Sequence, residues 1–160
     1  MQIRRATEKD IEEMRRLNQE CFSAHRDNSD LAILWLKCNF ARYPWAQFFV
    51  SEDESGKITG YILWVEKGII RKEVVFELEQ IGVTASQRGG GIGTALIKET
   101  LPEIKKHLKS QGRALKLVEV TTGTGNEAQR LYKKTLGAEP VCIIPDLYRG
   151  DELIMIARNP

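Results

Sequence analysis

Two spacings of apolar residues alternate along the chain, one typical of helices and one typical of strands. Apolar positions three or four residues apart predict helices over residues 11–21, 30–40, 92–108 and 126–136. Short runs rich in β-branched and aromatic residues predict strands over residues 3–5, 48–50, 58–65, 74–84, 115–120, 141–144 and 153–157. The pattern predicts an α/β (α+β) fold, with a seven-stranded sheet and about four helices.

Local signals place several ends of these elements. Thr7 lies three residues before Asp10 at the start of the first helical run, which is the spacing of a helix N-terminal cap. Residues 54–57 join two strand runs as a hairpin turn, and Gly137 ends the last helical run. The pattern contains no internal repeat, low-complexity segment or linker. We therefore expect residues 1–160 to form a single domain.

A glycine-rich segment separates the strand run 74–84 from the longest helical run. Four of the five residues 89–93 are glycine, and Arg88 precedes them. Glycine allows φ > 0 and brings backbone N–H groups close to a ligand. The helix that follows adds its unpaired first N–H groups and the positive end of its dipole. The segment therefore predicts a phosphate-binding loop, to which Arg88 adds a charged donor.

Two common phosphate loops do not fit this segment. A Walker A loop ends in Gly-Lys-Ser/Thr, whereas Gly93 is followed directly by Thr94, which argues against a nucleotide triphosphatase. A dinucleotide loop needs a third glycine and lies in the first strand–helix unit, whereas this segment lies in the middle of the chain. A glycine-rich turn without a ligand is the remaining alternative. It is disfavoured because glycine costs about 0.5–1 kcal/mol relative to alanine in ordered elements.

The segment closely resembles the acetyl-CoA pyrophosphate loop of the GNAT superfamily of N-acetyltransferases. Its pattern, Gln/Arg-x-x-Gly-x-Gly/Ala, is matched by Arg88, Gly91 and Gly93. The predicted order of elements resembles that of the family over nearly the whole chain. The resemblance implies a mixed, mostly antiparallel sheet, splayed at its central pair of parallel strands. It also implies acetyl-CoA as the acetyl donor, bound by Arg88, Gly89, Gly90, Gly91, Ile92, Gly93 and Thr94.

The strand run before the loop carries the candidate base. A period of two residues places Glu77, Glu79, Ile81 and Val83 on one face. Many family members have a glutamate four residues before the position of Val83, which implies that Glu79 is the general base, directly or through a water molecule. Glu77 is the second candidate. An ordinary strand carboxylate paired with a lysine is the alternative for Glu79.

Gly82 lies inside the same strand run, where a glycine often marks a bulge or a close backbone approach. In the family, a bulge here opens a gap that accommodates pantetheine. The resemblance implies that the N–H of Val83 stabilises the oxyanion and that backbone groups of Ile81 bind the pantetheine arm. A glycine required only for packing is the alternative.

The last helical run resembles the family segment Asn-x-x-Ala-x-x-Leu-Tyr. The resemblance implies that Asn126 contacts the cofactor and that the Tyr132 hydroxyl protonates the CoA sulfur as general acid. The match is imperfect, because Ala128 follows Asn126 by only two residues. From the residues alone, Asn126 is also a good helix cap and Tyr132 lies on the apolar stripe.

Two further residues are candidate contacts for the acceptor substrate. Residues 146–151 resemble the loop of ribosomal-protein N-terminal acetyltransferases in which a tyrosine helps to hold the acceptor peptide, which implies this role for Tyr148. His25 lies between the first two helical runs, where family members have acceptor-binding residues. A lone loop histidine without a functional role is the alternative.

Composition mainly excludes other classes of function. The chain has 24 basic and 22 acidic residues, a net charge of +2, so it lacks the basic excess of nucleic-acid-binding proteins. The cysteines at 21, 38 and 142 are widely spaced, which argues against a disulfide framework and a metal site. No apolar run reaches the ~18–20 residues that span a bilayer. We expect a soluble cytoplasmic protein without nucleic-acid or membrane partners, and a homodimer is an open alternative.

The sequence thus predicts an acetyl-CoA-dependent N-acetyltransferase that moves an acetyl group to a primary amine by direct transfer in a ternary complex. Two other classes stay open, namely a CoA-binding module without turnover and an interaction protein with an empty loop. The sequence does not distinguish among small-molecule amines, lysine side chains and protein N-termini as acceptors. It also leaves open acyl groups other than acetyl.

Overall fold

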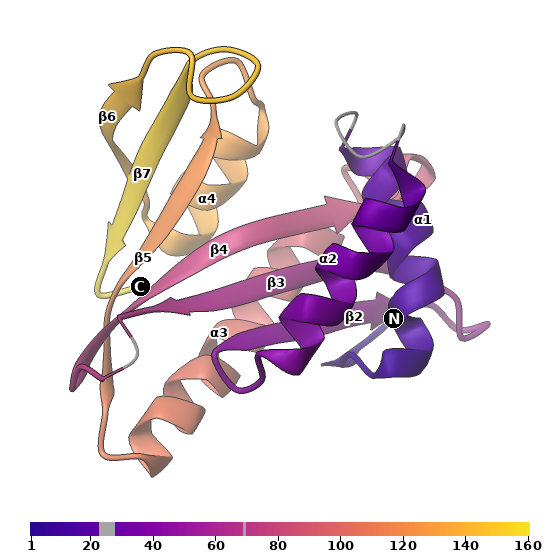
Figure 1. Ribbon diagram of the computed structural model, residues 1–160, viewed down its shortest axis with the longest axis horizontal. Coiled ribbons are helices and arrows are strands. Elements are labelled where there is room, and N and C mark those ends of the chain that lie inside the picture. Colours follow the sequence, from indigo (N-terminus) through magenta and orange to yellow (C-terminus); the bar gives the residue numbers. More distant parts are fainter. Residues whose placement is uncertain (23–27, 69) are drawn as a thin grey trace. The chain divides into compact units, whose positions relative to one another are not determined.

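The computed structural model describes residues 1–22, 28–68 and 70–160. Its seven strands form one sheet in the order β1-β2-β3-β4-β5-β7-β6 (Figure 1). The strands are β1 (Gln2–Arg5), β2 (Ala46–Glu52), β3 (Ile58–Lys67), β4 (Glu73–Val83), β5 (Ala114–Gly123), β6 (Glu139–Ile144) and β7 (Glu152–Arg158). The α-helices in these ranges are α1 (Ile11–Cys21), α2 (Ser29–Ala41), α3 (Ile92–Ser110) and α4 (Ala128–Leu136). Short 3₁₀ helices, η1 (Glu8–Asp10) and η3 (Ala85–Gln87), precede α1 and α3.

The sheet is mixed, which confirms the predicted fold class. Strands β1 and β2, β5 and β7, and β6 and β7 pair antiparallel, whereas β4 and β5 pair parallel. The β4–β5 ladder includes the pairs Glu73 with Ala114 and Glu77 with Glu119.

The chain divides into two compact units. The first consists of Met1–Trp64 and Gln80–Thr100, and the second consists of Val65–Glu79 and Leu101–Pro160. The boundaries lie inside β3, β4 and α3, so each unit contains part of these three elements. A single domain over residues 1–160 stays a prediction.

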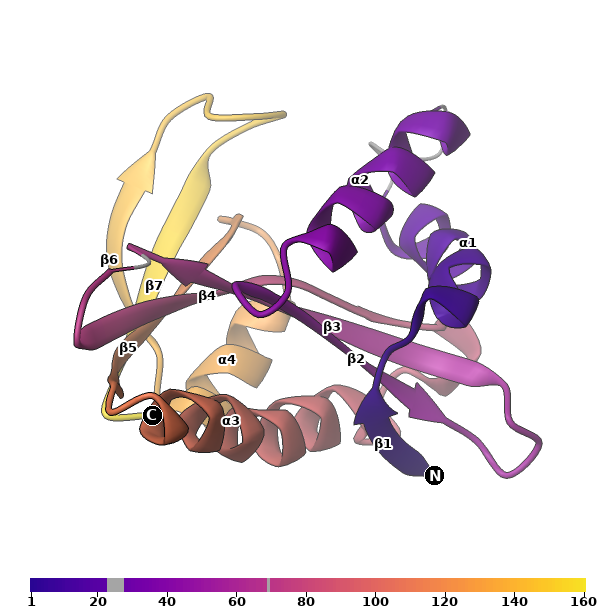
Figure 2. The same ribbon diagram turned by 60° about the horizontal axis from the view of Figure 1, so that its bottom comes forward.

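In the first unit, helices cover both faces of β2 and β3. Figure 2 shows α1 and α2 on one face and the first half of α3 on the other. On the α3 face, the indole N–H of the fully buried Trp64 donates to Thr100 Oγ1 at 2.8 Å. On the α1 face, Asn18 Nδ2 donates to the hydroxyl of Tyr61 at 2.8 Å. Because both faces are covered, residues 61–64 are continuously apolar instead of alternating with polar residues.

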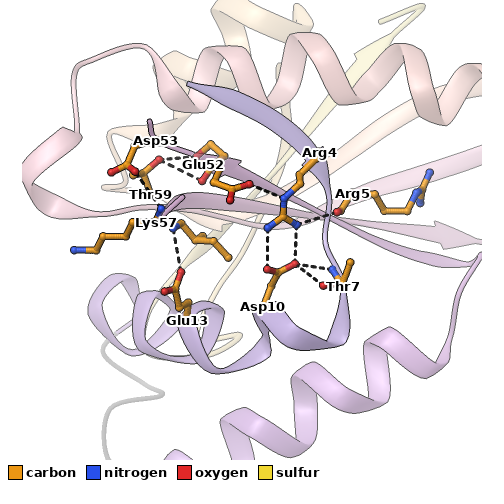
Figure 3. A network of polar contacts seen from close by, with 11 residues as sticks. Arg4, Arg5, Thr7, Asp10, Glu13, Glu52, Asp53, Lys57 and Thr59 are labelled. Carbon is orange, nitrogen blue, oxygen red and sulfur yellow. Dashed lines mark hydrogen bonds and ion pairs between the residues drawn. The ribbon is translucent and has the colours of Figure 1, made fainter. Parts of the chain in front are cut away.

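An ion pair joins β1 to the start of α1 (Figure 3). The Arg4 guanidinium donates two hydrogen bonds to the Asp10 carboxylate, at 2.8 and 2.9 Å, and its Nε donates to Glu52 at 2.6 Å. The Thr7 N–H donates to the same Asp10 carboxylate at 2.7 Å. Asp10 is only 8% exposed, and the Arg4 guanidinium holds the pKa of its carboxyl below the usual value. The relation predicted between Thr7 and Asp10 is therefore present, with Arg4 as an additional partner.

In the second unit, α4 packs on β5, and β6 forms the edge of the sheet (Figure 1). The Glu66 carboxylate is almost fully buried, and it accepts two hydrogen bonds from the Arg113 guanidinium. Nearby on the sheet, Lys67 Nζ contacts Glu77 at 2.7 Å and Glu119 at 3.4 Å. In the part of the chain that the structure describes, no helix is long and apolar enough to cross a bilayer.

We expect the Arg4–Asp10 contact to make stability depend on pH. The folded-state pKa of Asp10 lies below its ordinary value of 3.8, so the carboxylate stabilises the fold above that pH. This contribution is lost as the pH falls through the lower folded-state pKa. Asp10→Asn should therefore lower the free energy of unfolding by about 1.5–3 kcal/mol at neutral pH. Urea unfolding at neutral and acid pH would test this, since wild type and variant should converge in acid. A difference that stays constant with pH would contradict the assignment.

Candidate functional site

The loop before α3 has the backbone conformation expected of an anion-binding loop. Gly89 and Gly91 have φ values of 79° and 89°. A Cβ added at either position would meet nothing within 4 Å. Backbone conformation, and not crowding, is therefore the reason why these two positions require glycine. At Gly90 an added Cβ would lie 3.1 Å from the carbonyl oxygen of Gln87, so the loop is also tight at that point.

Several backbone donors of this loop have no partner. The first hydrogen bond of α3 runs from the Ala95 N–H to the Gly91 carbonyl at 2.9 Å. The N–H groups of the first three helical residues thus precede the intrahelical ladder. Within the described part of the chain, backbone acceptors are absent for the N–H groups of Gly89, Gly91, Ile92, Gly93 and Thr94. Such converging donors at a helix N-terminus favour a phosphate.

A cavity of about 720 Å³ adjoins the loop in the first unit. Its lining includes Gln87, Arg88 and Gly90 of the loop, and Asp53 and Glu54 of the β2–β3 hairpin. These carboxylates disfavour an anion near the hairpin. Anion binding in this cavity is therefore favoured near Arg88 and the Ile92 N–H, which has no backbone acceptor among the described residues.

The Arg88 side chain turns back to the end of β4. Its Nε donates to the Val83 carbonyl at 3.0 Å, and a terminal nitrogen lies 3.5 Å from Cys21 Sγ. The Cys21 thiol donates to the same carbonyl at 3.4 Å, and burial raises its pKa. Part of the Arg88 guanidinium is therefore engaged within the fold, and Nη1 is the nitrogen that is left for an anion. Sequence reasoning placed Cys21 only at the end of the first helical run and did not predict this contact.

Gly82 lies where α1 approaches β4 closely. An added Cβ would lie 3.0 Å from Leu17, 3.1 Å from Tyr61 and 3.2 Å from Cys21. These distances are shorter than ordinary contacts and favour the packing explanation for this glycine. The register shift in the β4–β5 ladder lies elsewhere, between Val74 and Val75.

The two candidate bases on β4 differ in exposure. Glu77 is buried and pairs with Lys67, whereas Glu79 is exposed. Ile81 and Val83, the two predicted backbone contacts for the cofactor, are half-buried. Of the two carboxylates, Glu79 is thus the more accessible to a substrate.

Tyr132 on α4 is a buried tyrosine whose hydroxyl lacks a partner. Its side chain packs so closely that the residue is 6% exposed, and burial raises its pKa to about 12. Within the described residues its hydroxyl makes no hydrogen bond, although buried tyrosine hydroxyls usually find one. The hydroxyl is therefore protonated at neutral pH and able to donate to a ligand.

The turn before α4 differs from the prediction. The helix begins at Ala128, not at Asn126, because the Asn126 side chain accepts a hydrogen bond from the Ala128 N–H at 2.9 Å. The Gln129 amide donates to the carbonyls of Gly123 and Thr124, at 2.9 Å each, and holds the turn from the other side. Asn126 itself is exposed. Its side-chain oxygen thus supports the turn, whereas Glu127 and not Asn126 occupies the cap position of α4.

The remaining candidates are less constrained by the fold. Tyr148 is 75% exposed in the connection between β6 and β7, and His25 lies outside the described residues. Among the residues that are described, there is no group of three or more His, Cys, Asp or Glu side chains placed to hold a metal. The first unit brings Ile81, Val83, Arg88 and the loop together, whereas Glu79, Asn126, Tyr132 and Tyr148 belong to the second.

Comparison with known proteins identifies the family. The model of the acetyltransferase (GNAT) family matches residues 11–138. The chain belongs to this family. It is 35% identical over 96 residues to an uncharacterised N-acetyltransferase of Methanocaldococcus jannaschii, a match that covers 58% of the chain and 38% of that relative.

Solved structures share the GNAT fold over nearly the full chain. A spermidine N-acetyltransferase variant from Vibrio cholerae aligns with a TM-score of 0.73 and 18% identity, covering 99% of this chain and 95% of that one. A ribosomal-protein-alanine N-acetyltransferase from Brucella melitensis aligns with a TM-score of 0.70 and 19% identity, covering 99% of both chains. At these identities, the likeness concerns the fold.

Two buried tyrosines provide a matched test of the unpaired hydroxyl. Tyr132→Phe should change the free energy of unfolding by no more than about 0.5 kcal/mol, because the fold offers its hydroxyl no partner. Tyr61→Phe should cost about 1–3 kcal/mol, because it removes a hydroxyl bonded to both Asn18 and Gln80. Chemical denaturation of both variants measures the difference. Equal losses would show that Tyr132 has a bonding partner in the fold.

Proposed function

We propose that the chain transfers an acetyl group from acetyl-CoA to a primary amine, by direct transfer in a ternary complex. The observation that carries the proposal is the loop before α3, in which two glycines of positive φ precede a row of unpaired N–H groups. A CoA pyrophosphate supplies the oxygens that these donors require. Family membership supports the same cofactor.

The cofactor has three kinds of contact in this proposal. Residues from Arg88 to Thr94 hold the pyrophosphate, mainly through backbone N–H groups. Backbone groups of Ile81 and Val83 contact the pantetheine arm. The exposed Asn126 adds a contact at the start of α4.

In the reaction, the amine nitrogen attacks the thioester carbonyl carbon. A C–N bond forms, the C–S bond breaks, and CoA leaves as a thiolate that takes up a proton. The Val83 N–H stabilises the negative charge that develops on the carbonyl oxygen. Glu79, directly or through water, removes the proton that the ammonium must lose before attack. Glu77 is less suited to this role because it is held by Lys67.

The pKa of Tyr132 defines how it assists the leaving group. Burial raises this pKa, so the hydroxyl keeps its proton at neutral pH. Tyr132 donates a hydrogen bond to the departing sulfur, which takes up the proton that the nitrogen releases as it becomes an amide. Its protonated state at neutral pH suits that task.

The acceptor is an amine of a small molecule or of a protein. The spermidine and ribosomal-protein-alanine N-acetyltransferases that share the fold represent both classes. Tyr148 is exposed enough to contact either kind of acceptor.

Acetyl-CoA should raise the melting temperature of the wild-type protein. Gly91→Ala should lower the apparent affinity for acetyl-CoA at least tenfold, because a methyl group or a shifted φ disturbs the loop N–H groups. Gly112→Ala is the matched control, since Gly112 also has positive φ and open space around its missing Cβ. Both variants should lose about 1–2 kcal/mol of stability from backbone strain. Thermal shift with acetyl-CoA measures both effects. No shift of the wild type at millimolar acetyl-CoA would reject the proposed cofactor site.

Tyr132→Phe should lower kcat by about 10–100-fold, because the leaving sulfur loses its donor. Acetyl-CoA affinity should stay close to wild type, since the ring and its packing remain. Thiol release from acetyl-CoA with an accepted amine measures the rate. Unchanged kcat would make Tyr132 a packing residue, and binding of acetyl-CoA without turnover on any amine would favour a CoA-binding module.

A further inference from the structure

Gln80 on β4 is held by a buried polar network that the proposed chemistry does not use. The Tyr61 hydroxyl donates to Gln80 Oε1 at 2.6 Å, and Asn18 Nδ2 donates to the same oxygen at 3.0 Å. Asn18 and Tyr61 are fully buried, whereas Gln80 is half-buried. All three residues belong to the first unit.

These contacts fix the orientation of the Gln80 amide. Exchanging its oxygen and nitrogen would direct Nε2 at the Asn18 amide nitrogen, so that two donors would face each other. With Oε1 directed inward, the Nε2 group is the outer end of the side chain. Within the described residues Nε2 has no acceptor. The fold therefore presents a donor whose direction is set by two buried side chains.

The position of Gln80 relates this donor to the substrates. Gln80 follows Glu79, the proposed base, and precedes Ile81, a proposed pantetheine contact. Its side chain lies on the α1 face, where Tyr61 and Asn18 meet it. If the proposed function is correct, this segment of β4 accompanies the end of the cofactor that carries the acetyl group. Because neighbouring residues of a strand point to opposite faces, an acceptor that meets the Gln80 amide approaches the thioester from the α1 face.

An amide N–H₂ distinguishes between classes of amines. A polyamine or simple alkylamine carries N–H and C–H groups beside its reacting nitrogen, and these leave the Gln80 donor unpaired. An amino acid, an amino-acid amide or a peptide N-terminus carries a carbonyl or carboxylate oxygen two bonds from the nitrogen-bearing carbon, and this oxygen accepts from the donor. Unpaired polar groups in a half-buried site carry a penalty, so the second class is favoured.

We propose that Gln80 is a specificity-determining residue that selects acceptors with a carbonyl or carboxylate oxygen beside the amino group. This inference rests on the proposed function and narrows its acceptor class. It places amino acids, their amides and peptide N-termini ahead of polyamines.

Glycinamide and propylamine are suitable probes, because they are similar in size and differ in the carbonyl group. Gln80→Met keeps the length of the side chain and removes the donor. It should lower kcat/KM for glycinamide about tenfold and for propylamine by no more than about threefold. Each variant is compared with wild type on the same amine, so the different basicities of the two amines cancel. Tyr61→Phe removes one contact that orients the amide, and it should shift the selectivity in the same direction by a smaller factor.

Gln47→Met is the matched control. Gln47 is another glutamine of the first unit, and it is buried. Both ends of its amide are bonded inside the fold, to Arg5 and to the Pro44 carbonyl. Replacing Gln47 should lower stability and leave the ratio of kcat/KM for glycinamide to kcat/KM for propylamine unchanged. A shift in that ratio with Gln80→Met alone therefore supports a direct contact with the acceptor.

Three results would overturn the inference. Equal losses on glycinamide and propylamine with Gln80→Met would show that the donor serves the common substrate, acetyl-CoA. A wild-type protein that binds acetyl-CoA but acetylates neither glycinamide nor a peptide N-terminus would exclude the acceptor class while the cofactor site stands. Absence of acetyl-CoA binding would reject the proposed function itself, and the inference with it.

Discussion

The close approach of α1 to the end of β4 is the constraint on which the first unit depends. Gly82 leaves no room for a side chain, so the helix lies directly on the strand. Residues of α1 then reach the backbone that leads to the loop. Glu20 accepts from the Ala85 N–H at 2.5 Å, and Cys21 donates to the Val83 carbonyl. A larger residue at position 82 would move α1 away and release both contacts.

The fold pairs most of its buried polar groups and leaves a few donors unpaired. The ion pairs Arg4–Asp10 and Arg113–Glu66 are satisfied within the fold and contribute to stability. The Tyr132 hydroxyl, the Gln80 amide nitrogen and the N–H groups of the loop have no such partner among the described residues. Because the Tyr132 hydroxyl adds little to the stability of the free protein, its replacement separates effects on ligand binding from effects on folding.

Sequence reasoning succeeded where function depends on local geometry. The glycine loop is specified by adjacent residues, since Gly89 and Gly91 adopt the positive φ for which glycine is suited, and the order of elements follows from periodicity. Contacts between segments far apart in the sequence could not be predicted in this way. The meaning of Gly82 depends on α1, and the orientation of Gln80 depends on Asn18, 62 residues away. The start of α4 was placed two residues too early because side-chain contacts of Asn126 and Gln129 stabilise a turn there. The catalytic roles of Glu79 and Tyr132 stay predictions.

Recognition through backbone N–H groups has a consequence for sequence divergence. Every residue except proline supplies the same N–H group, so a loop that binds an anion in this way constrains the φ angles of its residues more than their side chains. Glycine at the two positions of positive φ is the main requirement, and most neighbouring side chains are free to vary. This chain shares its fold with structural neighbours although only 18–19% of the aligned residues are identical. Substitution of most side chains in such a loop therefore leaves its N–H donors in place.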